Sequence, residues 1–268
     1  MLLSKYIYEI SGIDLDKKKT YLFETRLGPL VKDSGFSTYS ELYYKAKMDK
    51  SLERNIINAI TTNETSFFRD TGPFELLQHK ILPDLIDKRT DKSSRLLPIS
   101  LSVWSAACST GQEVFSIAIT LKELLPDLKK YNIKLLGTDI SDSVVAQASY
   151  GAFGKFEIER GLPKDKLAKY FSPNGGKWKI KDEIRSMANF KKLNLMLPFS
   201  GLGKFDIILC RNVAIYFSME DKKKVFNKIS EILKPDGYLI IGSTESLTGI
   251  SPKFEPKRYL RSVYYELK

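Results

Sequence analysis

The sequence predicts an α/β protein in which an all-helical segment precedes a doubly wound sheet. Residues 1–86 carry apolar residues at helical spacing throughout, which predicts helices only. After residue 98, short apolar runs alternate with amphipathic stretches, the pattern of strands alternating with helices. The composition, 43% hydrophobic and 28% charged over 268 residues, is that of a chain able to bury a sizeable core.

Five helices are expected before residue 87, and turn and cap residues mark their ends. Gly12 ends the first helix, and Asp16 precedes the second, which Pro29 is expected to bend or end. Thr38 can cap the third helix, and Pro73 suits the first turn of the fifth. The expected helices cover, in order, about residues 2–11, 17–31, 38–48, 52–60 and 73–85.

The stretch after these helices, DKRTDKSSR (87–95), is charged and shows no apolar periodicity. Such a stretch is typical of a linker, which we place at residues 87–97. The chain is therefore expected to hold a helical N-terminal domain (1–86) and a second, α/β domain (98–268).

Strands and helices alternate in the second domain until one segment interrupts them. FDIILC (205–210) resembles a buried parallel strand, and Lys-Pro-Asp-Gly at 234–237 predicts a turn. The segment at about 154–194, with a Pro-Asn-Gly-Gly turn at 173–176, is interpreted as an insertion of short antiparallel strands. The expected elements are strands at 99–105, 134–140, 205–210, 238–243 and 261–267, and helices at 113–125, 141–149 and 219–233.

Basic residues exceed acidic ones by 43 to 32, a formal net charge of +11. More than half of the excess lies in residues 154–194, where 11 basic and 5 acidic side chains give +6. This segment is either a solvated surface or a docking face for an acidic partner. Nucleic acid is not an expected partner, because the sequence has no zinc-finger spacing, RNP-like aromatic motif or arginine-rich arm.

Two cysteines and one histidine exclude a disulfide framework and any zinc site that needs several such ligands. No stretch approaches the about 18 apolar residues of a membrane span, and the first residues lack the features of a secretory signal. The expected location is the cytoplasm, without membrane insertion. The absence of heptads or a large apolar surface run predicts a monomer.

The loop after the first expected strand, Ala106 to Gly111, consists of small residues that let a ligand approach the backbone. It lacks the GxGxxG string of dinucleotide sites, and Glu113 at the following helix start would repel pyrophosphate but attract a cation. S-adenosylmethionine, with its sulfonium and ammonium groups, fits such a loop. Cys108 and Cys210 are interpreted as small residues lining the same crevice.

Asp139 ends the second expected strand, where nucleoside-binding α/β folds place a carboxylate on the ribose hydroxyls. The alternative is a helix cap, because Asp-Ile-Ser-Asp precedes a helix. Combined with the small-residue loop, ribose binding is the favoured interpretation.

Five strings occur together in one known family. They are NETSFFR (63–69), which fits N-x-T-x-F-F-R, WSAACSTGQEVFS (104–116), Asn194-Leu195, CRNVAIYF (210–217) and GSTESL (242–247). On these strings the sequence resembles the chemotaxis receptor methyltransferases, the CheR family, over essentially its whole length. The order of the five strings makes the resemblance specific.

The resemblance implies S-adenosylmethionine-dependent methylation of glutamate side chains on the cytoplasmic helices of chemoreceptors, with S-adenosylhomocysteine as the second product. It implies a Rossmann-like methyltransferase domain with a small β-subdomain, and no metal. Arg69 and Tyr216 would lie nearest the reacting centre, and basic residues of the second helix, Lys19, Arg26 and Lys32, would face the receptor. The cofactor contacts it implies are Asn63, Thr65, Arg69, Glu113, Asp139, Asn194, Leu195, Arg211 and Asn212.

Several alternatives stay open at this level. Arg69 either orients the acceptor carboxylate or the cofactor, or forms an ion pair with a neighbour such as Asp70 or Glu64. Tyr216 is either a hydrogen-bond donor to the acceptor or a buried aromatic. The chain could methylate another acceptor, such as a small carboxylic acid or RNA, or sense the cofactor without turnover. The helical N-terminal domain and the NETSFFR string favour the receptor, and the presence of Arg69 and Tyr216 favours an enzyme.

Overall fold

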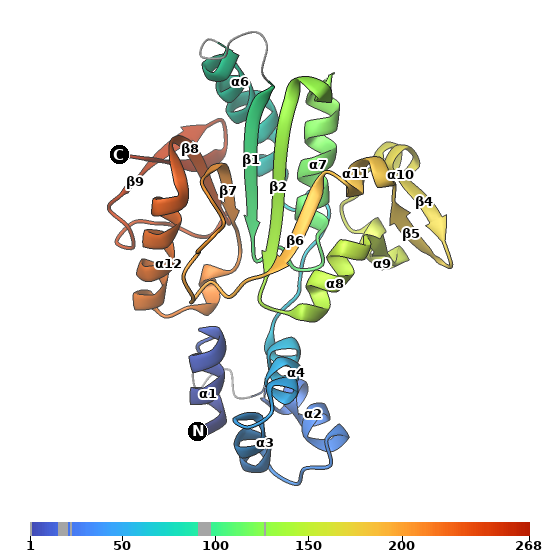
Figure 1. Cartoon of the computed structure of the whole chain (residues 1–268), viewed down its shortest axis with the longest axis vertical. Helices are drawn as coiled ribbons and strands as arrows, with labels where there is room; N and C mark the ends of the chain where they lie inside the picture. The colour runs from blue at the N-terminus through green and yellow to red at the C-terminus, as the bar shows by residue number, and fades with distance from the viewer. Residues whose placement is uncertain (1, 16–20, 22, 91–97, 126) are drawn as a thin grey trace.

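A computed structural model describes residues 2–15, 21, 23–90, 98–125 and 127–268 (Figure 1). It confirms the predicted fold class, since a small all-helical domain precedes an α/β domain with a second, smaller antiparallel sheet. The first domain lies at the end of the molecule toward which the strands β1 (Ile99–Ala106) and β2 (Tyr131–Asp139) run (Figure 1).

The helical domain contains α1 (Leu2–Ser11), η2 (Phe23–Leu27), α2 (Gly28–Asp33), α3 (Tyr39–Ala46) and α4 (Lys50–Ile60). Thr38 caps α3 as predicted, because its side chain accepts the backbone N–H of Glu41. Pro29 does not end its helix but lies in the first turn of α2, where a missing N–H costs no hydrogen bond. Buried apolar side chains, among them Ile7, Leu42 and Ile56, form the core of this domain.

The next helices, α5 (Thr71–Leu76), η3 (Leu77–Ile81) and α6 (Leu82–Thr90), do not pack in that core. Their buried side chains, such as Phe74 and Leu85, join the cluster that contains Val103 of β1. This differs from the expected helical domain of 1–86, and residues 87–90, expected in a linker, continue α6. Because packing decides membership, we propose that the domain boundary lies at residues 61–63.

The main sheet has the order β6-β2-β1-β7-β8-β10-β9, in which β6 is the short strand Ala188–Lys192. The strands β6, β2, β1, β7 (Phe205–Cys210) and β8 (Leu233–Ile241) are parallel, whereas β10 (Ser262–Leu267) and β9 (Phe254–Tyr259) are antiparallel additions. The chain goes from β1 outward to β2 and β6 and then returns to β7 on the other side. This topological switch point between β1 and β7 is where open α/β sheets bind ligands, beyond the carboxyl ends of the strands.

Helices cover both faces of the sheet. Successive residues of one strand point to opposite faces of the sheet, so Val103 and Trp104 of β1 belong to different cores. Helix α7 (Gln112–Leu124) packs on the first face, with α8 (Asp142–Tyr150) near the carboxyl end of β2, and α12 (Met219–Ile232) packs on the second (Figure 1).

The inserted subdomain is shorter and more helical than expected. Its sheet has the order β3-β5-β4, built from β3 (Ala152–Phe153), β4 (Phe171–Asn174) and β5 (Lys177–Ile180). Helices α9 (Lys155–Glu159), α10 (Lys164–Tyr170) and α11 (Asp182–Arg185) surround it. The last part of the predicted insertion is wrong, because β6 (Ala188–Lys192) pairs in parallel with β2 and belongs to the main sheet.

Two expectations near the end of the chain also differ from the structure. Lys234–Gly237 ends α12 as predicted but lies within β8, where the pairing jumps from Phe205–Leu233 to Ile207–Tyr238. The extra residues loop out of register without ending the strand. The edge strand β9 was not predicted, since its Glu, Pro, Lys and Arg residues conceal the alternation expected of a strand.

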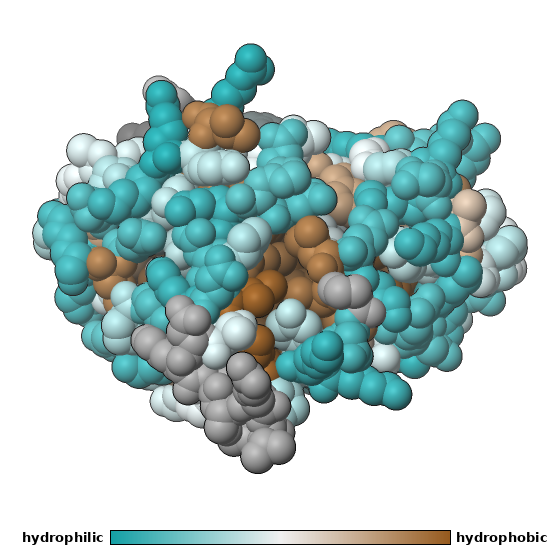
Figure 2. All heavy atoms as spheres, turned by 90° about the horizontal axis from the view of Figure 1, so that it is seen from above, coloured by the Kyte–Doolittle hydropathy of each residue, from teal (hydrophilic) through white to brown (hydrophobic). Residues whose placement is uncertain are grey.

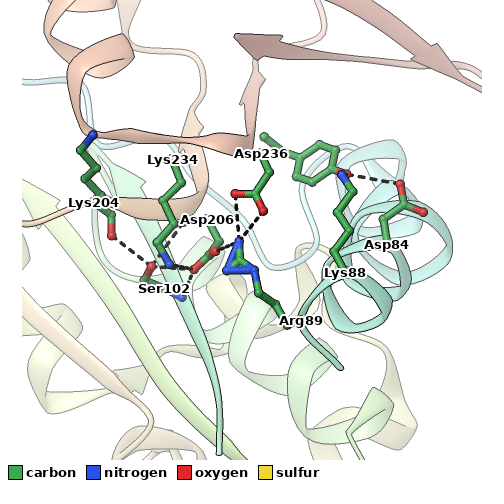
Figure 3. Close-up of polar contacts among 9 residues, drawn as sticks. Asp84, Lys88, Arg89, Ser102, Lys204, Asp206, Lys234 and Asp236 are labelled. Atoms are coloured by element: carbon green, nitrogen blue, oxygen red, sulfur yellow. Dashed lines mark hydrogen bonds and ion pairs between the residues drawn. The ribbon is translucent and has the colours of Figure 1, made fainter. Parts of the chain in front are cut away.

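A buried polar network ties α6 to the amino ends of the central strands (Figure 3). Asp206 of β7 is fully buried and accepts hydrogen bonds from the Ser102 backbone N–H at 2.8 Å, the Ser102 hydroxyl at 2.7 Å and the Lys234 ammonium at 2.8 Å. Arg89 of α6 lies 2.7 Å from its other oxygen and also donates to Asp236. Figure 2 looks onto this end of the molecule, where polar side chains surround a central apolar hollow.

Candidate functional site

A cavity of about 360 Å³ is lined by residues that follow the carboxyl ends of β1, β2 and β7 and by residues of the helical domain. Every predicted cofactor contact lines it, and so does Tyr216. These residues are Asn63, Thr65, Arg69, Glu113, Asp139, Asn194, Leu195, Arg211 and Asn212. The N-terminal domain also contributes to the lining, which was not predicted. Its lining residues include Ser11, Ile13, Leu15 and Tyr21.

The loop after β1 contributes three small residues, Ala107, Cys108 and Ser109, to the lining of the cavity. Ala107 and Ser109 have φ angles of 59° and 51°, which non-glycine residues rarely adopt. Gly111 has a φ of 95°, and a Cβ there would lie 2.9 Å from Cβ of Ala148. Such strain is concentrated where the surrounding structure imposes it for a function. Gly111 thus lets the loop pack closely against α8, and the approach of a ligand to the backbone of this loop stays a prediction.

Asp139 lies at the end of β2 with only 7% of its surface exposed. Its two oxygens accept the backbone N–H groups of Ser109 at 2.9 Å and Ser141 at 3.0 Å. Burial raises the pKa of this carboxyl, and the two N–H donors partly offset the rise. The cap of α8 is Ser141 rather than Asp139, because the Ser141 side chain accepts the Val144 N–H. Each Asp139 oxygen keeps acceptor capacity for a ligand hydroxyl.

Glu113, Arg211 and Asp70 form one charged cluster at the cavity. The Arg211 guanidinium donates to Glu113 at 2.7 Å, to Asp70 at 2.9 Å and to the Arg69 carbonyl at 2.8 Å. Ser105 donates to the second Glu113 oxygen at 2.7 Å. The Arg211 side chain is only 2% exposed. Arg211 thus lines the cavity as expected, but its Nη donors hold protein groups, so we assign it a positioning role.

The NETSFFR segment contacts the cluster through the backbone carbonyl of Arg69, and the backbone has positive φ angles at the two residues next to Arg69. Phe68 and Asp70 have φ angles of 48° and 56°, while Phe67 is fully buried. Arg69 donates to the Glu64 carbonyl at 2.9 Å, and the Glu64 carboxylate pairs instead with Arg160. The carboxylates of both residues proposed as ion-pair partners of Arg69 thus bind other arginines. Glu64 pairs with Arg160, and Asp70 pairs with Arg211. Arg69 lines the cavity at its rim.

Asn194 is expected to contact the cofactor, but its side chain joins the two domains. Its amide donates to the Ile10 carbonyl of α1 at 2.9 Å, and its carbonyl oxygen accepts the Met196 N–H at 2.9 Å. The Asn194 amide keeps a second N–H and its carbonyl oxygen a second lone pair, so its side chain can still contact a ligand in the cavity. Leu195 is 6% exposed and supplies an apolar wall.

The segment after β7 contributes the remaining predicted residues. Asn212 has a φ of 55°, and its N–H and that of Gly242 both donate to Glu245 at 2.8 Å. Tyr216 ends η5 (Ala214–Tyr216), and its carbonyl accepts the Asp14 N–H at 2.9 Å. Glu245 was not predicted as a site residue, although it lies in the GSTESL string that marks this loop.

The residues expected to face a receptor fall into three situations. Arg26 lines the cavity, and its Nη1 donates to the Ile60 and Thr61 carbonyls at 3.0 and 2.8 Å, at the end of α4. These bonds contradict a purely outward role, because they satisfy helix-end carbonyls. Lys32 is exposed on α2. Lys19 lies outside the described residues.

Cys108 and Cys210 are buried near the cavity. Burial, reinforced by nearby carboxylates, raises the pKa of both thiols. The single histidine, His79, lies in η3 and does not line the cavity. Cys108 lines the cavity, as predicted, whereas Cys210 is buried in the core on the second face of the sheet and is absent from the lining.

The cavity fits a cationic nucleoside better than a phosphate ester. The Arg211 guanidinium is shared by two carboxylates, Glu113 and Asp70, so this cluster carries one net negative charge. The lining as a whole is balanced, with Arg26, Arg69 and Arg211 against Glu64, Glu113 and Asp139. Asp139 adds a second acidic acceptor on the ribose side. Small residues after β1 line the cavity. These features match the sulfonium, ammonium and ribose of S-adenosylmethionine.

Among the described residues, no helix combines the length and apolarity that crossing a bilayer requires.

The family model described as CheR methyltransferase, SAM binding domain, matches residues 63–261. The model described as CheR methyltransferase, all-alpha domain, matches residues 2–61. These two matches meet where the packing of α5 and α6 places the domain boundary.

Curated relatives match over nearly the full chain. Chemotaxis protein methyltransferase Cher2 of Pseudomonas putida is 37% identical over 270 residues, covering 98% of this chain and 95% of its own. A chemotaxis protein methyltransferase of Vibrio parahaemolyticus is 38% identical over 275 residues, covering 99% and 95%. One of Borreliella burgdorferi is 39% identical over 256 residues, covering 92% and 87%.

Proposed function

The chain belongs to the CheR methyltransferase family, and from this we propose that it methylates glutamate side chains of chemoreceptors with S-adenosylmethionine. The products are glutamate methyl esters and S-adenosylhomocysteine. The observation that carries the proposal is the single cavity that gathers Glu113, Asp139, Arg69 and Tyr216 at the switch point of the sheet.

The acceptor chemistry needs no general base. A glutamate carboxylate has a pKa near 4.3 in water and is already ionised at neutral pH. Bound S-adenosylmethionine supplies a methyl group on a sulfonium, and charge is lost when a carboxylate accepts it. The protein must therefore align the acceptor and exclude water, and alignment alone is worth up to about 7–11 kcal/mol in model reactions.

Each residue of the cavity has a distinct part in this scheme. Asp139 accepts from ribose hydroxyls, and Glu113 favours the cationic end of the cofactor. Arg211 positions the carboxylate of Glu113 and the backbone of Arg69. The side chains of Arg69 and Tyr216 line the rim, where they orient the acceptor carboxylate. A tight clamp by Arg69 would stabilise the ionised acceptor more than the transition state, so its role is orientation.

The proposed receptor has to reach the rim from solvent. Lys32, exposed on α2, and the basic subdomain are the described surfaces that suit an acidic partner. The short elements of the subdomain lie beside the sheet, at a distance from α2 (Figure 1). Two separate contacts would raise the effective concentration of a receptor at the cavity.

Arg69→Ala is expected to lower kcat/KM for receptor methylation at least about tenfold, because an unoriented carboxylate seldom meets the methyl group in line. The measurement is transfer of radiolabelled methyl groups to a receptor cytoplasmic fragment. Tyr216→Phe, which removes one hydroxyl, should cost less. Arg258→Ala, on the edge strand β9 and exposed, is the control and should keep normal turnover.

Near-normal turnover of the Arg69→Ala protein, with unchanged unfolding temperature, would remove Arg69 from the mechanism. The same assay tests the proposed function itself. Wild-type protein that binds S-adenosylmethionine but labels no receptor fragment would contradict receptor methylation. Label that resists mild alkali would contradict a glutamate ester.

A further inference from the structure

The segment between β6 and β7 forms one wall of the cavity and has no regular secondary structure. Leu193, Asn194 and Leu195 line the cavity. The Leu193 N–H donates to the Asp139 carbonyl at 2.8 Å, which ties the start of the segment to the end of β2. Backbone carbonyls of an irregular segment need partners other than a helix or strand ladder.

Lys228 of α12 supplies those partners. Its ammonium lies 2.5 Å from the Leu195 carbonyl oxygen and 2.8 Å from that of Leu197. It also lies 4.6 Å from the centre of the Phe199 ring, a cation–π distance. One side chain therefore contacts three residues of the same short segment.

The environment of Lys228 differs from that of an ordinary surface lysine. Burial lowers the pKa of its ammonium, while Asp221 and Glu231 act in the opposite direction. The ammonium has three N–H donors, and two of them meet carbonyls. Its position costs desolvation, which these contacts offset.

Lys228 does not line the cavity, so any effect on a ligand must pass through Leu195. Leu195 is 6% exposed and packs in the same core as Val225 and Ile229 of α12. On the opposite side of the segment, the Asn194 amide holds the end of α1 at 2.9 Å. The wall is thus fixed by α12 on one side and by the helical domain on the other.

We propose that Lys228 is a positioning residue for the cofactor, and that its ammonium holds the Asn194–Leu195 wall of the cavity in the binding conformation. This inference rests on the proposed function, because it assumes that the cavity binds S-adenosylmethionine. It concerns cofactor affinity and assigns Lys228 no contact with the acceptor.

The test compares Lys228→Met with wild type, because methionine keeps an unbranched apolar chain but cannot donate. The affinity for S-adenosylhomocysteine, measured by calorimetry, is expected to fall about tenfold, because a wall without its charged donor occupies the binding conformation a smaller fraction of the time. The KM for the receptor fragment, at saturating S-adenosylmethionine, should stay within about twofold of wild type.

Lys223→Met is the matched control, since Lys223 is an exposed lysine on the same helix. Its affinity should equal that of wild type. Lys228→Arg keeps a cationic donor and should recover most of the lost affinity. If the methionine variant does not fold, Lys228→Gln takes its place, with a smaller loss expected because its amide can still donate.

Unchanged affinity in Lys228→Met, with or without a lower unfolding temperature, would overturn the proposal and leave Lys228 a purely structural residue. A rise in receptor KM with unchanged cofactor affinity would overturn it too. Failure of the wild type to bind S-adenosylhomocysteine would instead contradict the proposed function, so the two failures are distinguishable.

Discussion

Replacing Asp206 with alanine is expected to lower the free energy of unfolding by about 3–5 kcal/mol, the cost of breaking a buried ionic network from its centre. Asp206 is fully buried, and its carboxylate contacts Ser102, Lys234 and Arg89 (Figure 3). Its removal leaves the Ser102 N–H without this acceptor and two cations without their shared counterion. Both losses carry the desolvation cost of the groups left behind.

The measurement is equilibrium unfolding in urea, followed by far-UV circular dichroism. Asp236→Ala is the matched control, because Asp236 also binds Arg89 but its side chain is 31% exposed. An exposed ion pair contributes about 0–1 kcal/mol, so this variant should stay near wild type. Equal stability of the two variants would show that the network contributes no more than a surface pair.

Replacing Asp139 with alanine is expected to weaken S-adenosylhomocysteine binding about 10–100-fold. Hydrogen bonds to a charged group contribute about 1.5–3 kcal/mol, and each 1.4 kcal/mol corresponds to a factor of ten. Calorimetry on the purified protein measures the change. Asp142→Ala is the control, because Asp142 lies three residues later but pairs with Lys192 at the surface. Equal affinities for the two variants would exclude Asp139 as a ribose ligand.

The same carboxylate predicts the acid side of the binding profile. Burial raises the pKa of Asp139 above its ordinary value of 3.8, so protonation begins at a higher pH than for an exposed aspartate. Protonation removes the charge that strengthens hydrogen bonds from ribose hydroxyls. Affinity should therefore fall as the pH falls through the raised pKa, and Asp139→Asn should lose this part of the dependence.

The stability effect of Asp139 has the opposite direction. A raised folded-state pKa means that the protonated form favours folding. Its contribution to the free energy of unfolding is fully present below the unfolded value of 3.8 and is lost as the pH rises through the folded-state pKa. At neutral pH the protein thus keeps a charge that costs stability, which is typical of functional residues.

Much of the site could be predicted from the sequence because its residues lie at strand ends. Asp139 ends a predicted strand and Glu113 starts the helix after another, and parallel strands bring such positions to one edge. Arg211 was predicted only through the resemblance to the family. The NETSFFR segment was identified by its resemblance to the family and not by any local rule. What the Arg211 guanidinium binds could not be predicted, since Asp70 and Glu113 reach it from distant parts of the chain.

The errors in the fold have a common origin. Periodicity predicted α5 and α6 as helices with an apolar side, but it does not say which core that side enters. Strand β6 was assigned to the insertion because a short polar edge strand has no distinctive pattern. Arg26 was assigned to a receptor surface by its place in the family pattern, whereas its guanidinium binds the end of α4.

The sequence by itself determined the fold class, most of the helices and strands apart from β6 and β9, the small-residue loop after β1 and the family, because spacing, turn chemistry and motif order are local properties. Only the tertiary structure decided the domain boundary, the ion pairs of Arg211 and Asp206, and the contact of Lys228 with the cavity wall. These depend on which distant groups meet in a low-dielectric interior, where each buried charge must find a partner.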